Sequence, residues 1–150
     1  MSSRIVVALL LFSLVSVAWA TPGLVTKVSP HSVDETVERV ESLLSKKGIR
    51  VFAVVDHRSN AQGAGLELGE ITLIVFGNPK LGTPMMQSNP TVGIDLPMKI
   101  VVWRGADDKV YLAYNDPEYL AGRHGITDRD GVVKKMSGAL SNLTDKAIEP

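Results

Sequence analysis

The sequence has 150 residues, of which 45% are apolar and 21% charged, with 16 basic against 16 acidic side chains. This balance is typical of one globular domain. It argues against disorder and against nucleic-acid binding, which needs a basic excess to neutralise phosphates. The sequence contains no cysteine, which excludes disulfides, zinc–thiolate sites, iron–sulfur clusters and cysteine nucleophiles.

The first twenty residues have the three-part layout of a secretory signal peptide. Met1–Arg4 carries one basic residue, Ile5–Val17 is apolar apart from two serines, and Ala18–Ala20 supplies a small-x-small cleavage pattern. The apolar run is shorter than the ~20 residues that cross a bilayer, so we expect cleavage and no stable membrane insertion afterwards. The alternative is an uncleaved anchor. We predict a signal peptide over residues 1–20, one domain over residues 21–150, and export to the bacterial periplasm, or secretion where there is no outer membrane.

A strand and a helix follow in the mature chain. Enrichment in valine and threonine predicts the strand Leu24–Ser29. Ser32 then caps a helix, with Glu35 three positions later as in a capping box, and Gly48 can end the helix in the left-handed conformation. The apolar residues of this helix recur at helical spacing: Val33, Val37, Val40, Leu43 and Leu44.

The middle of the chain predicts two strands separated by a polar segment. Within residues 49–56, every second side chain from Ile49 to Val55 is aliphatic, which is the alternation of a strand. Residues 71–76 form a continuous apolar run between glycines. The segment between them is compatible with a short helix over residues 61–65, capped by Ser59 or Asn60.

Residues 78–97 are rich in proline and glycine, which predicts an irregular loop with one or two helical turns near residues 85–88. Two strands, residues 99–103 and 110–114, follow as a hairpin around the turn at residues 104–109.

Two helices complete the chain. Asn115, Asp116 and Pro117 begin a short helix that extends to Arg123, and Asp130 can cap the last helix. The order is therefore β-α-β-β-β-β-α with short inserted helices. Consecutive strands after the first helix predict an α+β fold of two layers, an antiparallel sheet with helices on one face.

Six segments of this chain resemble the bacterial DUF302 family, whose function is unknown. They lie in the family's order, and the resemblance extends over roughly residues 33–136. The resemblance implies a TATA-binding-protein-like single-copy fold, in which a curved antiparallel sheet grips a long helix, and it implies homodimers. The segments are Asp56–His57 with Ala61 and Gly65–Leu68, Val75–Lys80, Gly82–Gln87, Asp95–Lys99, Tyr114–Pro117, and Leu120, Ala121 and Arg123–Gly125.

Two histidines are candidates for chemistry. His57 follows a strand and His124 follows a short helix, and a histidine at either place can act as a general base or metal ligand near neutral pH. The structural alternatives are that His57 bonds a loop carbonyl and that His124 bonds the carbonyls at the end of its helix.

The loop after the third strand and the hairpin supply further ligand-binding candidates. Asn78 and Lys80 begin a loop whose backbone N–H groups could hold an anion, although it lacks the spacing of a nucleotide-binding loop. The alternative is a turn-rich loop that packs against the sheet or crosses a dimer interface. Trp103 and Tyr111 could line a ligand groove or simply pack across two strands.

A copper site is a weaker alternative. Thioether and imidazole ligands suit copper, and the sequence offers Met85 and Met86 together with His57 and His124. No close ligand spacing supports this site, and methionine is more often found in protein cores.

We expect an exported homodimer that serves as a small-ligand-binding or accessory domain. Its partly apolar cavity would lie between the sheet and a helix, with His57 and residues 78–86 at the rim. The alternative is a histidine-based or metal-dependent periplasmic enzyme, with copper as the candidate metal. No organic cofactor is predicted.

Overall fold

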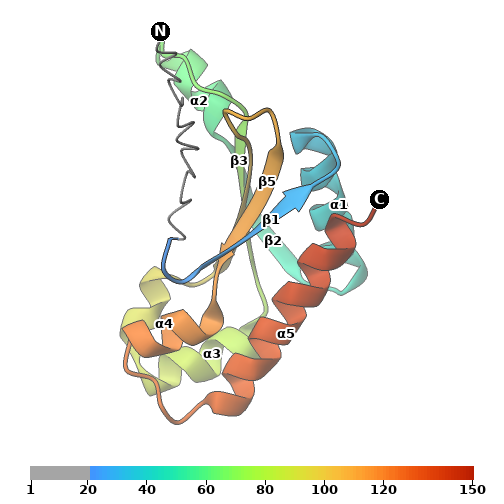
Figure 1. Ribbon diagram of the computed structural model, residues 1–150. Coiled ribbons are helices and arrows are strands. Elements are labelled where there is room, and N and C mark those ends of the chain that lie inside the picture. Colours follow the sequence, from blue (N-terminus) through green and yellow to red (C-terminus); the bar gives the residue numbers. More distant parts are fainter. Residues whose placement is uncertain (1–20) are drawn as a thin grey trace, which may run out of the picture.

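The computed structural model describes residues 21–150, and its centre is one open sheet of five strands (Figure 1). The predicted signal peptide, residues 1–20, lies outside the described residues. The strands are β1 (Leu24–Ser29), β2 (Arg50–Asp56), β3 (Ile71–Gly77), β4 (Met98–Arg104) and β5 (Val110–Asn115). They lie in the order β1-β5-β4-β3-β2, and each neighbouring pair is antiparallel. All five predicted strands and the β4–β5 hairpin are confirmed.

Two long helices, α1 (Val33–Lys46) and α5 (Asp130–Ala147), lie side by side and form the second layer (Figure 1). The hydrophobic core lies between this layer and the sheet. Side chains that are 0% exposed come from α1, from α5 and from three central strands, and they include Val40, Leu44, Ile74, Ile100, Leu112 and Ala147. The structure confirms the α+β class. Within residues 21–150, no helix combines the length and the apolar character that crossing a bilayer requires.

The predicted caps of α1 are present in the structure, whereas the predicted cap of α5 is not. At α1 the Ser32 hydroxyl accepts a hydrogen bond from the Glu35 N–H at 3.1 Å, and Gly48 has φ +64° just after the helix. Both predictions are confirmed. Asp130 was expected to cap α5, but Arg129 holds the cap position with no side-chain hydrogen bond. Asp130 is instead the first helical residue, where its negative carboxylate interacts favourably with the positive end of the helix dipole.

The short helix after β2 begins earlier than predicted. It is α2 (His57–Gly63), and Asp56 caps it, accepting hydrogen bonds from the Ser59 N–H at 3.0 Å and the Ser59 hydroxyl at 2.6 Å. These bonds stabilise the carboxylate and lower the pKa of Asp56 below its usual value. The predicted caps, Ser59 and Asn60, are therefore wrong, because the strand's last residue already supplies the capping oxygen.

The segment predicted as an irregular loop is mostly helical. It contains α3 (Pro79–Ser88) and a 3-10 helix, η1 (Pro90–Ile94). Asn78 caps α3, because its Oδ1 accepts the Lys80 N–H at 3.0 Å, and Pro79 occupies the first turn, where proline is well tolerated. The Asn78–Pro79 pair therefore marks a helix start here. Pro84 lies inside this helix.

The last short helix, α4 (Pro117–Arg123), matches the prediction. Asp116 caps it through a 3.0 Å hydrogen bond from the Glu118 N–H to Oδ1. In Figure 1, α3 and α4 gather at one end of the molecule and α2 lies at the other end.

Candidate functional site

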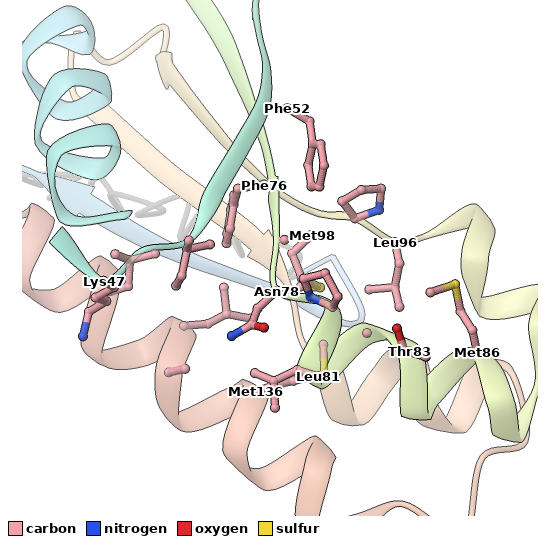
Figure 2. A pocket seen from close by; sticks show the side chains of 18 residues that line it. Lys47, Phe52, Phe76, Asn78, Leu81, Thr83, Met86, Leu96, Met98 and Met136 are labelled. Carbon is pink, nitrogen blue, oxygen red and sulfur yellow. The ribbon is translucent and has the colours of Figure 1, made fainter. Parts of the chain in front are cut away.

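A pocket of about 380 Å³ opens where the sheet meets α3 and α5 (Figure 2). Its residues come from the end of α1, from β2, β3 and β4, from α3 and from α5. They are Lys47, Ile49, Phe52, Phe76, Gly77, Asn78, Pro79, Leu81, Gly82, Thr83, Met86, Leu96, Pro97, Met98, Met136, Ala139, Leu140 and Leu143. A cavity thus lies where one was expected, between the sheet and a helix. Most of residues 78–86 line it, as predicted, but His57 does not.

Core side chains form the deep part of the pocket. Phe76 and Met98 come from β3 and β4, Met136 and Leu140 come from α5, and each is less than 9% exposed. Because these residues also belong to the main core, the inner wall is held rigidly by the packing of the two layers.

Phe52 forms an outer wall because β2 is irregular at this residue. Val51 pairs with Phe76 and Ala53 pairs with Val75, so Phe52 has no partner of its own on β3. An extra residue of this kind is a β-bulge, which redirects a side chain. The ring lies close to Gly77, where an added Cβ would come within 3.2 Å of Phe52 Cε2. Phe52 remains 46% exposed beside the pocket.

Helix α3 supplies the opposite wall through Leu81, Gly82, Thr83 and Met86. Gly82 has no side chain, and a Cβ there would find Leu96 Cδ1 at 3.7 Å, an ordinary contact distance. A methyl group therefore fits at this position beside Leu96, which also lines the pocket.

Polar side chains are few and lie at the surface of the pocket. The lining includes the side chains of Lys47, Asn78 and Thr83, all exposed. Figure 2 shows Lys47 at one end of the pocket, Thr83 and Met86 at the other, and Asn78 between them. The pocket is consequently apolar inside, with a cation at one end.

Of the predicted ligand-binding residues, only Asn78 lines this pocket. Lys80 is exposed on α3 and is not part of the lining. Trp103 alternates along β4 with the buried Val102, so it lies on the other face of the sheet. There its ring stacks on Tyr111 with centroids 5.3 Å apart, and the Tyr111 hydroxyl donates to Asp107 at 2.7 Å. Cross-strand packing is thus the arrangement that the structure shows.

The two histidines are far apart. His57 is the first residue of α2 and does not line the pocket, so its expected position at the rim is wrong. His124 ends α4, and α2 and α4 lie at opposite ends of the molecule (Figure 1). The physical reason is that the capping of α2 by Asp56 keeps His57 at the distal end of β2.

His124 belongs to a hydrogen-bonded cluster of its own. Its Nε2 lies 2.6 Å from Asp95 Oδ2 and its Nδ1 lies 2.8 Å from Thr91 Oγ1. The side chains of His124 and Asp95 are only 7% and 11% exposed. In addition, the Asn89 amide donates to the His124 carbonyl at 2.7 Å. Both ring nitrogens are engaged, and the cluster joins α4 to η1 and the segment after it.

The four suggested copper ligands are not brought together. Met85 is 1% exposed in the core, Met86 lines the pocket, and His57 and His124 lie at opposite ends. Among residues 21–150, no group of three or more histidine, aspartate or glutamate side chains is arranged to hold a metal ion.

Sequence reasoning missed Lys47, Phe52 and the α5 side of the pocket. Lys47 reads as a solvent-exposed residue at a helix end, and the bulge that turns Phe52 leaves no signal in the strand pattern. Met136 and Leu140 were visible only as part of an apolar helical stripe, because the stripe does not say which of its members border a cavity.

An open antiparallel sheet covered by two helices, with an apolar pocket at one end, defines a small α+β domain. The chain belongs to the DUF302 family, since the model of this "Domain of unknown function" matches residues 25–143.

Curated proteins from Brucella are also similar to this chain in sequence. It is 44% identical over 126 residues to "Fluoride-specific ion channel FluC 1" of Brucella suis biovar 1 and to the protein of the same name from Brucella abortus biovar 1. The match covers 83% of this chain but only 50% and 47% of those proteins. This chain therefore spans about half the length of the curated relatives it matches.

A solved structure has the same fold. The crystal structure of an uncharacterized conserved DUF302 protein from Bacillus stearothermophilus matches with a TM-score of 0.76 and 21% sequence identity. The match covers 85% of this chain and 99% of that chain. The five-stranded α+β architecture is thus that of a known DUF302 structure.

Proposed function

We propose that this domain binds a small, largely apolar molecule in the pocket between the sheet, α3 and α5. The observation that carries the proposal is the pocket itself, about 380 Å³ in volume and lined mainly by apolar side chains. Ligand sites are typically concave, apolar and ~300–1,000 Å³ in size, with a few polar groups that fix orientation.

The volume limits the size of the ligand. One water molecule occupies ~30 Å³ in the liquid, so about a dozen non-hydrogen atoms would fill the pocket. A medium-length alkyl chain or a small aromatic molecule has this size. Its binding would shield Phe52 and Met86, which are 46% and 39% exposed in the free domain.

A titration with 1-octanol tests the proposal, because this alcohol is apolar, uncharged and small enough to enter. We expect saturable 1:1 binding in calorimetry, with NMR shift changes at the pocket residues. Gly82→Leu should abolish binding by extending into the pocket, whereas Gly82→Ala should bind normally. No binding by the wild type, or equal binding by a folded Gly82→Leu variant, would overturn the proposal.

A second proposal concerns the setting in which the domain acts. About half of each Brucella relative named a fluoride-specific ion channel aligns with this chain. We propose that the aligned half is an accessory domain, which binds a ligand beside the channel, and that the domain described here performs the same role. The predicted export and homodimerisation remain predictions within this proposal.

A further inference from the structure

Resting on the proposed function, we infer that the ligand is an amphipathic anion: its apolar chain fills the pocket and its carboxylate or similar head group binds Lys47. The inference concerns the chemical class of the ligand, which the apolar lining alone leaves open. It depends on the position of Lys47 and on the free hydrogen-bonding capacity of Asn78.

Lys47 is the cation of the pocket, and within residues 21–150 it forms no ion pair. It immediately follows α1, where it holds the C-cap position. The ion pairs of the described chain engage several other basic residues, including Lys27, Arg39, Arg104 and Lys109, and none of them uses the Lys47 ammonium group. A flexible ammonium group at the edge of an apolar cavity can keep its charge in water while its stem borders the ligand.

Asn78 adds a donor to the same pocket, between Lys47 and the end formed by Met86 (Figure 2). Its Oδ1 is fixed by the hydrogen bond from the Lys80 N–H, which assigns the other end of the side-chain amide as the NH₂ group. No hydrogen bond within the described residues uses that NH₂ group. An ammonium and a free amide donor at the surface of the pocket match the acceptor oxygens of an anionic head group.

The other end of the pocket suits an uncharged tail. Met86 and Leu96 lie there, and Figure 2 places Lys47 at the opposite end from Met86. No acidic side chain from the part of the chain that the structure describes lines the pocket, so its lining neither repels an anion nor attracts a cation. The arrangement therefore favours a molecule with one negatively charged end over an uncharged molecule or a cation of the same length.

Three eight-carbon probes separate these classes: octanoate, 1-octanol and octyltrimethylammonium. We expect octanoate to bind the wild-type domain about tenfold more tightly than octanol, the factor that one modest charge-assisted hydrogen bond supplies. Rising salt should reduce this preference because it screens an exposed charge pair. Equal affinities for octanoate and octanol, or a preference for the cation, would overturn the inference.

Substituting the lysine tests the assigned residue. Lys47→Met keeps most of the stem and removes the charge, so octanoate affinity should fall to that of octanol while octanol affinity is unchanged. Lys46→Met is the matched control, since Lys46 is adjacent, loses the same charge and lies in the last turn of α1, but does not line the pocket. Equal losses in both variants would overturn the role of Lys47.

Asn78→Asp gives an independent test. The aspartate keeps the capping oxygen of α3, but it replaces the NH₂ donor with a negatively charged oxygen. Octanoate binding should weaken and octanol binding should persist, and unchanged octanoate affinity would contradict the arrangement. The experiments also distinguish the two proposals: loss of octanol binding itself overturns the proposed function, whereas octanol binding without an octanoate preference overturns only the anionic ligand.

Discussion

Gly23 shows how one residue without a side chain fixes the start of the described domain. It has φ +75°, and a Cβ at this position would lie 2.2 Å from Tyr119 Cγ, the atom at which the ring begins. Its carbonyl accepts a hydrogen bond at 2.8 Å from the N–H of Asp116, the residue that caps α4. Glycine is thus required here both by the backbone conformation and by the aromatic ring packed against it.

We predict that Gly23→Ala lowers the free energy of unfolding by about 1–3 kcal/mol, because the variant combines a left-handed backbone with a steric clash. Urea denaturation measures the change. Gly138→Ala in α5 is the matched control: its Cβ would meet nothing within 4 Å, so it should stabilise by about 0.5–1 kcal/mol. A Gly23→Ala variant as stable as the wild type would contradict the prediction.

At the scale of secondary-structure elements, the His124 cluster acts as a connection between α4 and η1. Asp95 and Thr91 hold the two ring nitrogens, and Arg123 adds an ion pair to Asp95 at 3.3 Å. The cluster is separate from the pocket, because none of these residues lines it. The geometry therefore favours a structural role for His124 over ligand binding. Its ring bonds Asp95 and Thr91, however, and not the carbonyls at the end of its own helix.

His124→Ala should destabilise the protein by about 1–3 kcal/mol, because it leaves the mostly buried Asp95 carboxylate without its main partner. Arg123→Ala should cost much less, since the Arg123 side chain is 52% exposed. Denaturation together with octanol titration checks both statements. Loss of octanol binding in a folded His124→Ala protein would instead give His124 a functional role.

Some secondary-structure elements were predictable from the sequence pattern and others were not. The strands and α1 were predictable because composition, a continuous apolar run, alternation or helical spacing marks each of them within one continuous segment. Helix α3 was predicted only in part, as helical turns near residues 85–88, because Gly82 and Pro84 usually break helices. The Asn78–Pro79 pair that starts this helix was interpreted as part of an irregular loop. For α2 the strand and the helix share Asp56, so no loop separates the two patterns.

At the scale of the whole molecule, the question is how this domain relates to the longer Brucella relatives. The described residues form a domain with its own core, which lies between one five-stranded sheet and two long helices. A domain of this kind can be removed from a longer protein without disturbing the packing of the remainder.

We therefore predict that deleting the aligned half of the Brucella suis relative leaves fluoride conduction intact. Fluoride efflux from proteoliposomes would measure it, with the full-length relative as the control. If the accessory proposal is right, octanoate alters efflux through the full-length protein and has no effect on the shortened one. Loss of efflux from a shortened protein that still inserts and assembles would contradict the prediction.

The sequence by itself determined the class of fold, the five strands, the long helices and the family, because these depend on local periodicity and on short segments in a fixed order along the chain. Only the tertiary structure decided the site. The pocket joins four stretches that lie far apart in sequence, represented by Lys47 and Phe52, Asn78, Met98 and Met136. They meet through sheet pairing, a bulge and helix packing. The same packing separated His57 from His124, although each residue alone had the chemistry expected of a site. Residue type indicates what a side chain can do, but convergence in space decides whether it does so together with others.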